Sequence, residues 1–139
     1  MAFMKRVLVD MSATLIHHGH IRILKKASKF GKVIVALTVD EEILKVKGYL
    51  PELEYSFRKE ILESIRYVTE VVPSNWLIDE SFLNLHRIDL LVHGDDNSNL
   101  IPKNKLLIIP RTKGISSKNL RLKISSNFQE RPELLNKNE

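Results

Sequence analysis

The chain has 139 residues, of which 43% are hydrophobic and 28% charged, as expected for a single soluble globular domain with a core of its own. It contains no cysteine, which excludes disulfide bonds, thiolate zinc sites and cysteine nucleophiles and favours an intracellular, cytoplasmic setting. We expect no membrane-spanning segment and no secretory signal in residues 1–6. The formal net charge of +5 suggests an anionic partner. Because the basic residues are scattered and few aromatic residues lie among them, we expect a nucleotide rather than a nucleic acid, and no membrane.

Strand-like and helix-like segments alternate along the chain. Residues 6–10 are apolar and β-branched, which indicates a strand buried on both faces of a parallel sheet. In residues 18–29, Ile21, Leu24 and Ala27 share one side and the basic residues occupy the other, which indicates an amphipathic helix. The same patterns predict, in chain order, strands at 6–10, 33–38, 70–73, 89–93 and 105–109, and helices at 18–29, 40–44, 56–67, 77–86 and 116–124.

Two segments interrupt this alternation. Residues 45–51 contain glycine and proline, which predicts an exposed loop. Residues 127–139 are polar and have no hydrophobic period, which indicates a frayed tail. We therefore predict one domain over residues 1–124 and a polar C-terminal tail over residues 125–139.

The order of the elements predicts the fold class. Strands that alternate with helices of this length imply right-handed crossovers and a mostly parallel sheet. We therefore predict an α/β fold, a single Rossmann-like domain whose five-stranded sheet carries helices on both faces. In such sheets ligands bind beyond the carboxyl ends of the strands, where the strand order switches. The segments that follow strand ends, residues 11–20, 40, 93–96 and 111–117, should therefore open onto one rim.

A candidate anion site lies in residues 11–20 (MSATLIHHGH), at the junction of the first strand and the first helix. The first N–H groups of a helix have no partner within it, and the positive end of the helix dipole adds to them, so a phosphate docks there. Gly19 has no Cβ to keep a phosphate away. His17 and His20 lie three apart, so both are able to donate to one phosphate chain. Without further evidence, two other interpretations of these histidines stay open beside phosphate binding. They are exposed or core residues without a chemical role, or they share a zinc ion, for which no third ligand is evident.

Several segments resemble a known enzyme family. Residues 17–20 resemble the HxGH signature of the nucleotidyltransferase superfamily, and residues 111–117 (RTKGISS) resemble the RTxGIS motif of the small cytidylyltransferases of the glycerol-3-phosphate and phosphoethanolamine type. Residues 65–71 and 92–96 match in order and spacing, so the resemblance covers about residues 5–124. It implies a homodimeric enzyme that transfers CMP from CTP, with Mg²⁺, to a small phosphorylated alcohol in the synthesis of a polysaccharide or phospholipid precursor.

The resemblance also implies roles for individual residues. Those implied to be catalytic are His17, His20, Lys47 and Arg111. Those implied to bind the acceptor are Lys45, Lys47, Arg58 and Arg66, with a structural role as the alternative for Arg58. Those implied to contact the nucleotide are Val9, Asp10, Met11, Ser12, Gly19, His93, Gly94, Asp95, Asp96, Arg111, Thr112, Gly114, Ile115, Ser116 and Ser117. No metal ligand is assigned to a side chain. Judged by residue type alone, each of these residues also has an ordinary structural interpretation. A lysine in a polar loop is often a solvated charge, and a serine at a helix start often caps the helix. A histidine at the end of a strand often packs in the core.

One departure from the family concerns the segment before the first histidine. The family usually has Gly-Thr-Phe-Asp where this chain has Met11, Ser12, Ala13 and Thr14, so a carboxylate is missing. Asp10 lies four residues upstream and cannot be assumed to replace it. The segment resembles cytidylyltransferase domains linked to phosphonate and surface-polysaccharide pathways. Three alternatives therefore stay open: an adenylyltransferase of the same superfamily, a phosphonate cytidylyltransferase, and a module that binds nucleotide without turning it over.

Overall fold

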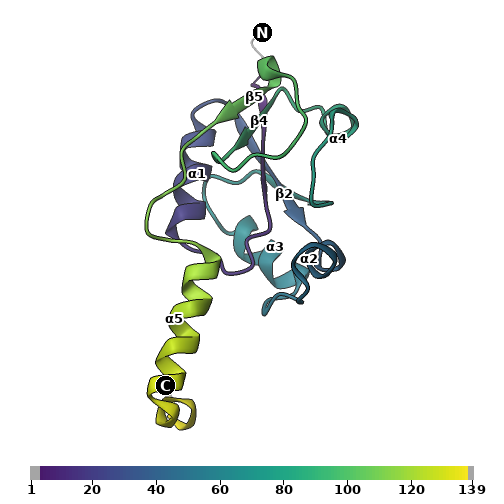
Figure 1. Ribbon diagram of the computed structural model, residues 1–139. Coiled ribbons are helices and arrows are strands. Elements are labelled where there is room, and N and C mark those ends of the chain that lie inside the picture. The colour runs from purple at the N-terminus through teal and green to yellow at the C-terminus, as the bar shows by residue number, and fades with distance from the viewer. Residues whose placement is uncertain (1–3, 138–139) are drawn as a thin grey trace.

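The structure, a computed structural model, describes residues 4–137 and is built around one five-stranded parallel sheet (Figure 1). The strand order is β3-β2-β1-β4-β5, in which the connections change direction between β1 and β4. The predicted α/β fold with a single Rossmann-like domain is confirmed. The strands are β1 (Arg6–Met11), β2 (Lys32–Thr38), β3 (Glu70–Ser74), β4 (Leu90–His93) and β5 (Leu106–Ile108).

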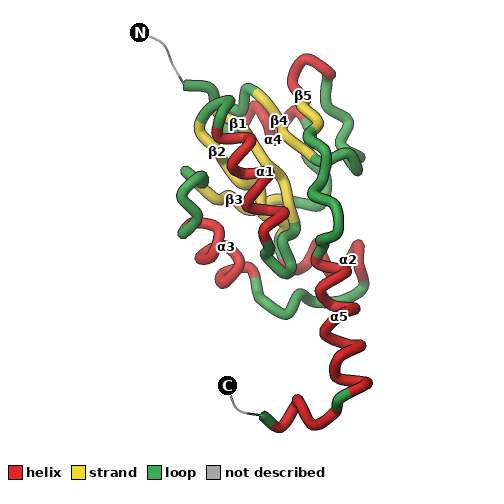
Figure 2. Tube along the Cα trace, turned by 90° about the vertical axis from the view of Figure 1, so that its left-hand side faces the viewer, coloured by secondary structure: helices red, strands yellow, loops and turns green. Residues whose placement is uncertain are grey.

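Helices cover both faces of the sheet, because alternate side chains of each strand point to opposite sides. On one side Val9 packs with Leu24 of the first helix and Leu62 of the third. On the other side Leu8 packs with Leu83 of the fourth helix. Figure 2 shows the first helix lying across one face. The helices are α1 (His18–Ser28), α2 (Asp40–Lys47), α3 (Tyr55–Glu63), α4 (Glu80–Leu85) and α5 (Ser117–Glu130), with 3-10 turns η1 (Lys103–Lys105) and η2 (Pro132–Asn136).

Helix α2 is longer than its sequence pattern predicts. It continues through Lys45 to Lys47 and ends at Gly48, which has a left-handed φ of 80°, a conformation that glycine adopts without steric cost. The N–H of Gly48 donates to the carbonyl of Leu44 at 2.9 Å. The predicted loop over residues 45–51 is therefore wrong for its first three residues, and both lysines lie in the last helical turn.

Helices α3 and α4 are shorter than predicted because the chain has to turn into the next strand. After α3, the N–H of Val68 donates to Ile65 in a turn, and the N–H of Thr69 donates to Val33 of β2 at 2.8 Å. These turns replace the last four residues of the predicted helix, and β3 then starts at Glu70, as predicted. Helix α4 begins late because the side chain of Asp79 caps it, accepting from the N–H of Phe82 at 2.8 Å.

Helix α5 projects away from the sheet (Figures 1 and 2). It runs to Glu130 and is followed by the turn η2, so the predicted frayed tail over residues 127–139 is wrong for the residues described, and residues 138–139 lie outside them. None of its residues is buried. Arg121 ties it to the body of the domain through two hydrogen bonds to Glu52, at 2.9 and 2.6 Å. Within residues 4–137, no helix is both long and apolar enough to cross a bilayer.

Candidate active site

A cavity of about 780 Å³ opens at the carboxyl ends of the strands, beside the point where the strand order switches between β1 and β4. A volume of this size suits a nucleotide-sized ligand. Among the described residues, seven basic side chains line it against three carboxylates, so its charge favours an anion. The basic residues are Arg22, Lys26, Lys47, Arg111, Lys113, Lys118 and Arg121, and the carboxylates are Asp10, Asp95 and Asp96.

The two imidazoles of the HxGH segment are held by the main chain at the start of α1. His17 is the N-cap residue, and its Nδ1 accepts from the N–H of Gly19 at 3.1 Å. The Nδ1 of His20 accepts from the N–H of His17, also at 3.1 Å, and the ring centroids lie 3.9 Å apart. Because each Nδ1 is an acceptor, the proton of each neutral ring is on Nε2. Both rings therefore have an Nε2–H donor.

Both imidazoles are neutral near pH 7. Burial, followed by the positive charges of His18 and Arg111, lowers the pKa of His17. Burial lowers the pKa of His20 to about 3, and His17 and Arg111 add to that effect. The two side chains therefore bind an anion as neutral N–H donors, and the cationic charge of the cavity comes from lysines and arginines.

Gly19 is required by the position of the His17 ring. A Cβ built at Gly19 would lie 2.8 Å from Cε1 and 2.9 Å from Nδ1 of His17, closer than real Cβ contacts. It would also lie 3.3 Å from Cγ2 of Ile115, in the loop before α5. The start of α1 and the start of α5 are therefore neighbours, although about a hundred residues separate them in the sequence.

The start of α5 is fixed by two serines. Ser116 caps the helix, because its Oγ accepts from the N–H of Asn119 at 3.0 Å. The Oγ of Ser117 donates to the carbonyl of Leu15 at 2.9 Å and lies 3.3 Å from the N–H of the same residue. Neither α1 nor α5 has an acidic residue in its first turn. Two helix N-termini with unopposed positive dipole ends therefore border one cavity, which favours a phosphate chain.

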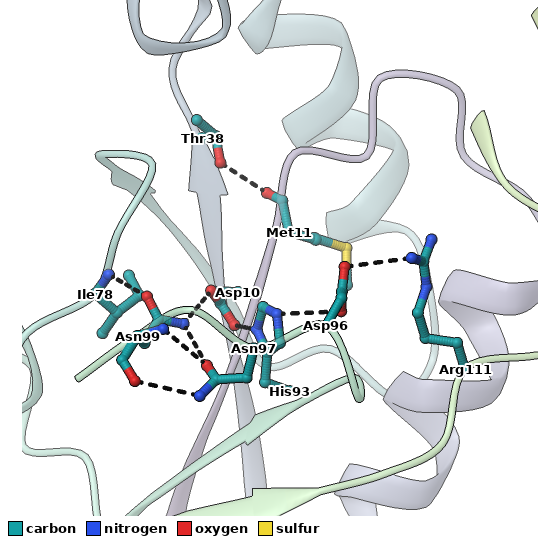
Figure 3. A network of polar contacts seen from close by, with 9 residues as sticks. All are labelled: Asp10, Met11, Thr38, Ile78, His93, Asp96, Asn97, Asn99 and Arg111. Carbon is teal, nitrogen blue, oxygen red and sulfur yellow. Dashed lines mark hydrogen bonds and ion pairs between the residues drawn. The ribbon is translucent and has the colours of Figure 1, made fainter. Parts of the chain in front are cut away.

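A polar network crosses the ends of β1 and β4 (Figure 3). Asp10 contacts Nδ1 of His93 with one carboxylate oxygen, and its other oxygen accepts from Nδ2 of Asn99 at 3.1 Å. Nε2 of His93 lies 3.5 Å from Oδ1 of Asp96, and NH1 of Arg111 lies 3.3 Å from Oδ2 of Asp96. Burial opposes protonation of His93, but the hydrogen bond to Asp10 and the charges of Asp10 and Asp96 outweigh it, so its pKa is raised.

The network also bears on the carboxylate that the family has at position 14. Thr14 is buried, at 3% exposure, and carries no charge. Both carboxylate oxygens of Asp10 are engaged, by His93 and by Asn99. Asp10 is therefore not placed as a free carboxylate that would take over from the missing one.

Two aromatic residues, Trp76 and Tyr49, also line the cavity, and sequence reasoning missed them. The Nζ of Lys47 lies 5.3 Å from the centroid of the Trp76 ring. The guanidinium of Arg121 lies 4.7 Å from the centroid of the Tyr49 ring. All four residues line the cavity. A lone aromatic residue in a polar segment has no periodic partner, so the sequence held no pattern that would have pointed to Trp76 or Tyr49.

Arg58 lies beneath the cavity and not on its wall. Its side chain is completely buried. It donates to the carbonyls of Ser12, Thr38 and Leu53 at 2.6, 3.0 and 3.0 Å, and to Oδ1 of Asp40 at 2.6 Å. The structure therefore corrects the predicted substrate contact: Arg58 holds together the segments that follow β1 and β2.

The structure also separates two other predicted residues from the cavity. Lys45 is exposed on α2, and Arg66 is exposed beside the ring of Tyr67; neither lines the cavity. The remaining predicted residues do line it, although their chemical roles stay predictions. They are His17, His20, Lys47 and Arg111, together with Val9, Asp10, Met11, Ser12, Gly19, His93, Gly94, Asp95, Asp96, Thr112, Gly114, Ile115, Ser116 and Ser117.

The fold and the cavity together define a nucleotide-binding domain of the Rossmann type, with N–H donors and cations at the point where the strand order switches. The family described as cytidylyltransferase-like matches residues 12–127. The chain belongs to this cytidylyltransferase-like family, as the two motifs in its sequence predicted.

Individual relatives support the same grouping. The chain is 37% identical over 128 residues to a glycerol-3-phosphate cytidylyltransferase of Bacillus subtilis, covering 88% of this chain and 98% of that protein. It is 38% identical over 122 residues to the enzyme of the same name from Staphylococcus aureus, covering 82% of this chain and 90% of that protein. Among solved structures, a lipopolysaccharide core biosynthesis protein from Thermoplasma volcanium superposes with a TM-score of 0.61 at 18% identity, covering 89% of this chain and 88% of that one. The last match shows the shared fold.

Proposed function

We propose that the protein is a cytidylyltransferase that transfers CMP from CTP to a small phosphorylated alcohol, of the glycerol-3-phosphate or phosphoethanolamine type, and releases pyrophosphate. The observation that carries the proposal is the convergence of the starts of α1 and α5 on one cationic cavity, with the N–H donors of His17 and His20 and the guanidinium of Arg111 on its wall. The relatives named for glycerol-3-phosphate support this acceptor class.

The proposed reaction exchanges one phosphate bond for another. An oxygen of the acceptor phosphate attacks the α-phosphorus of CTP, and a new oxygen–phosphorus bond forms. The bond from the α-phosphorus to the oxygen bridging to the β-phosphorus breaks, and pyrophosphate leaves with the electron pair. A phosphate monoester is already ionised near neutral pH, so no proton has to be removed from it. The obstacle is the repulsion between anions, and catalysis rests on positioning and on donors placed where negative charge grows.

The cavity residues fit this electrostatic task. Neutral Nε2–H groups of His17 and His20 donate to the triphosphate without carrying a charge of their own into a partly buried site. Arg111 offers a guanidinium fork, which matches phosphate oxygens. Lys47 lies on the cavity wall beside the ring of Trp76, and its ammonium suits the phosphate of the acceptor.

CTP would enter as its magnesium complex. Among residues 4–137, no three acidic or histidine side chains are placed to form a metal site by themselves. Mg²⁺ commonly binds through substrate phosphates, and the triphosphate of CTP supplies such oxygens; no side chain of this chain is assigned to the ion. The ion would offset the charge of the outer phosphates.

An assay of pyrophosphate release tests the proposal. The purified chain is incubated with Mg²⁺, with CTP or ATP, and with glycerol-3-phosphate, phosphoethanolamine or a small phosphonate. We expect release with CTP and at least one phosphate monoester, and loss of release when EDTA removes the metal. Release with ATP alone would establish the adenylyltransferase instead, and release with only the phosphonate would establish the phosphonate enzyme.

A second candidate function rests on Thr14. The carboxylate that the family has at this position is absent, and Asp10 is engaged elsewhere. The chain would then bind CTP without turning it over. Calorimetric binding of CTP, together with no pyrophosphate release for any acceptor of the panel, would favour this module over the enzyme.

We also propose a homodimer that works in the cytoplasm, where nucleoside triphosphates are made. Helix α5 exposes Leu122 and Ile124, at 59% and 49%, on a helix that has no buried residue. Apolar side chains on a projecting helix are suited to contact a second copy. Sedimentation at several concentrations tests this, and a monomer at all of them would contradict it.

A further inference from the structure

The network at the ends of β1 and β4 connects the buried sheet with the guanidinium of Arg111. Val9 pairs with Val92 in the register of the two strands, so Asp10 and His93, the next residue on each strand, are neighbours. The side chain of Asp10 is 8% exposed and that of His93 is 18% exposed. Asp96 and Arg111 lie nearer to solvent, at 57% and 52%. The contacts therefore run from the protein interior to the cavity.

Asp10 is held rigidly at the inner end. The buried side chain of Asn99 donates from Nδ2 to Asp10 at 3.1 Å, and its Oδ1 accepts from the N–H of Ile78 at 2.7 Å. The amide of Asn99 is thus oriented by the main chain, and it orients the carboxylate in turn. A carboxylate in such a place needs a cationic partner, and the partner that contacts it is the His93 ring.

The surroundings of His93 favour a doubly protonated ring. Nδ1 faces Asp10 and Nε2 faces Asp96, so each nitrogen faces a carboxylate oxygen. A neutral imidazole has one N–H and one lone pair, and only the imidazolium donates from both nitrogens. The raised pKa of His93 agrees with this reading. In its protonated form His93 therefore lies as a cation between two carboxylates.

The outer end of the network is closely packed. One oxygen of Asp96 faces His93 and the other faces Arg111. A Cβ built at Gly94 would lie 2.8 Å from Cγ of Arg111 and 2.9 Å from Oδ1 of Asp96. The stem of Arg111 therefore lies directly over the main chain of Gly94, beside the carboxylate of Asp96.

We propose that Asp10 is a positioning residue for the nucleotide site: through His93 it orients Asp96, and through Asp96 it places the Arg111 guanidinium for the triphosphate. We call Asp10, His93, Asp96 and Arg111 the polar relay. Asp10 and His93 then act on the nucleotide through Arg111, whereas the resemblance implied direct contacts for both. The inference rests on the proposed function for its kinetic consequences.

The polar relay predicts a pH dependence. The charged groups that face His93 are Asp10 from β1, Asp96 from the loop after β4 and Arg111 from the loop after β5. When the pH rises above the raised pKa of His93, the ring loses one proton, and Asp10 retains the N–H of Nδ1 because it is the more buried acceptor. A lone pair then faces Asp96, and this carboxylate and Arg111 lose their fixed position. We expect the KM for CTP to rise at that pH.

Two measurements on the full chain test the relay. NMR of the His93 ring, assigned by its loss in His93→Gln, gives the titration midpoint, and steady-state assays give the KM for CTP at each pH. Asp10→Asn removes the charge and keeps the shape, and should lower the midpoint by about 1–3 pH units, as loss of a close opposite charge does. The rise in KM should move by the same amount. Because CTP itself titrates near neutrality, variant and wild type are compared at the same pH.

Controls separate positioning from folding. Asp89→Asn removes a carboxylate at the opposite end of the sheet, where Asp89 accepts from the N–H of Arg6, and should move neither midpoint nor KM profile. If Asp10→Asn does not fold, Asp96→Asn replaces it, since this exposed side chain is not needed for the core; it should shift both quantities in the same direction.

Three results would overturn the inference. The first is a His93 midpoint in the wild type no higher than that of free histidine. The second is a midpoint that moves in the folded variant while the KM profile stays. The third does not depend on catalysis: it is an NMR signal of the Arg111 Nε–H group that does not change with pH at the titration midpoint of His93. A chain that turns over no acceptor would instead contradict the proposed function, and the NMR measurements would still decide on the relay.

Discussion

Replacing Arg58 with methionine separates a structural role from a substrate contact. The variant removes four hydrogen bonds and the buried partner of Asp40. Removing one partner of a buried ion pair costs about 3–5 kcal/mol. The Asp40 side chain is 24% exposed, so water offsets part of that cost, whereas each carbonyl left without its donor adds about 1 kcal/mol. We therefore expect Arg58→Met to lower the free energy of unfolding by about 3–5 kcal/mol.

Thermal and urea unfolding measure this loss. At about 3–4 °C for each kcal/mol in a domain of this size, the melting temperature should fall by about 10–20 °C. Arg66→Met is the matched control, because Arg66 is exposed, and surface changes usually stay within about 0.5 kcal/mol. An Arg58→Met variant that melts with the wild type but has a raised KM for the acceptor would refute the reasoning and restore the substrate contact.

Three further predictions concern the cavity. His17→Ala should lower kcat by about 10²–10³-fold, the usual cost of one transition-state donor, whereas His18→Ala, at an exposed neighbour, should leave kcat within about twofold; equal losses would contradict the assignment. Lys47→Met should raise the KM of the acceptor more than Lys45→Met does, and a larger effect of Lys45 in the same steady-state assay would contradict the placement of the two lysines on α2. The third prediction is acid sensitivity: the unfolded chain, with an ordinary histidine pKa of 6.5, binds a proton that the folded chain, with His20 at about 3, does not. Stability should be complete above pH 6.5 and fall below it by up to about 1.4 kcal/mol per pH unit. Urea titrations at pH 7 and pH 5 should show a smaller loss for His20→Gln, and an unchanged loss would contradict the cause.

The strands could be predicted from the sequence because of where they lie. A strand covered on both faces is a continuous apolar run with β-branched residues, and β1 and β2 follow this pattern closely. The ends of helices depend on tertiary contacts, which such patterns do not contain. Helix α2 continues to a glycine with positive φ, and α3 ends at Glu63, after which the chain turns toward β3 and Thr69 donates to β2.

The candidate site likewise has features that the sequence predicts and features that only the fold shows. The convergence of the segments around His17 and Arg111 follows from a topological rule, since parallel strand ends meet at one edge. Asp10 and His93 are 83 residues apart, and no local pattern marks them as a pair. Arg58 is an arginine beside Lys59 and Glu60, a residue type that is mostly exposed, and only the fold shows that its side chain is buried.

Because the imidazoles of His17 and His20 cap α1, the acceptor has to be phosphorylated before this protein acts on it. The Nδ1 of each ring accepts a hydrogen bond from a main-chain N–H, so neither His17 nor His20 has a free lone pair that faces the ligand. These two rings therefore cannot act as a general base that removes the proton from the hydroxyl group of an unphosphorylated alcohol. Under the proposed reaction, the acceptor must therefore arrive already carrying its phosphate, and this protein performs the step that follows the one in which that phosphate ester is made.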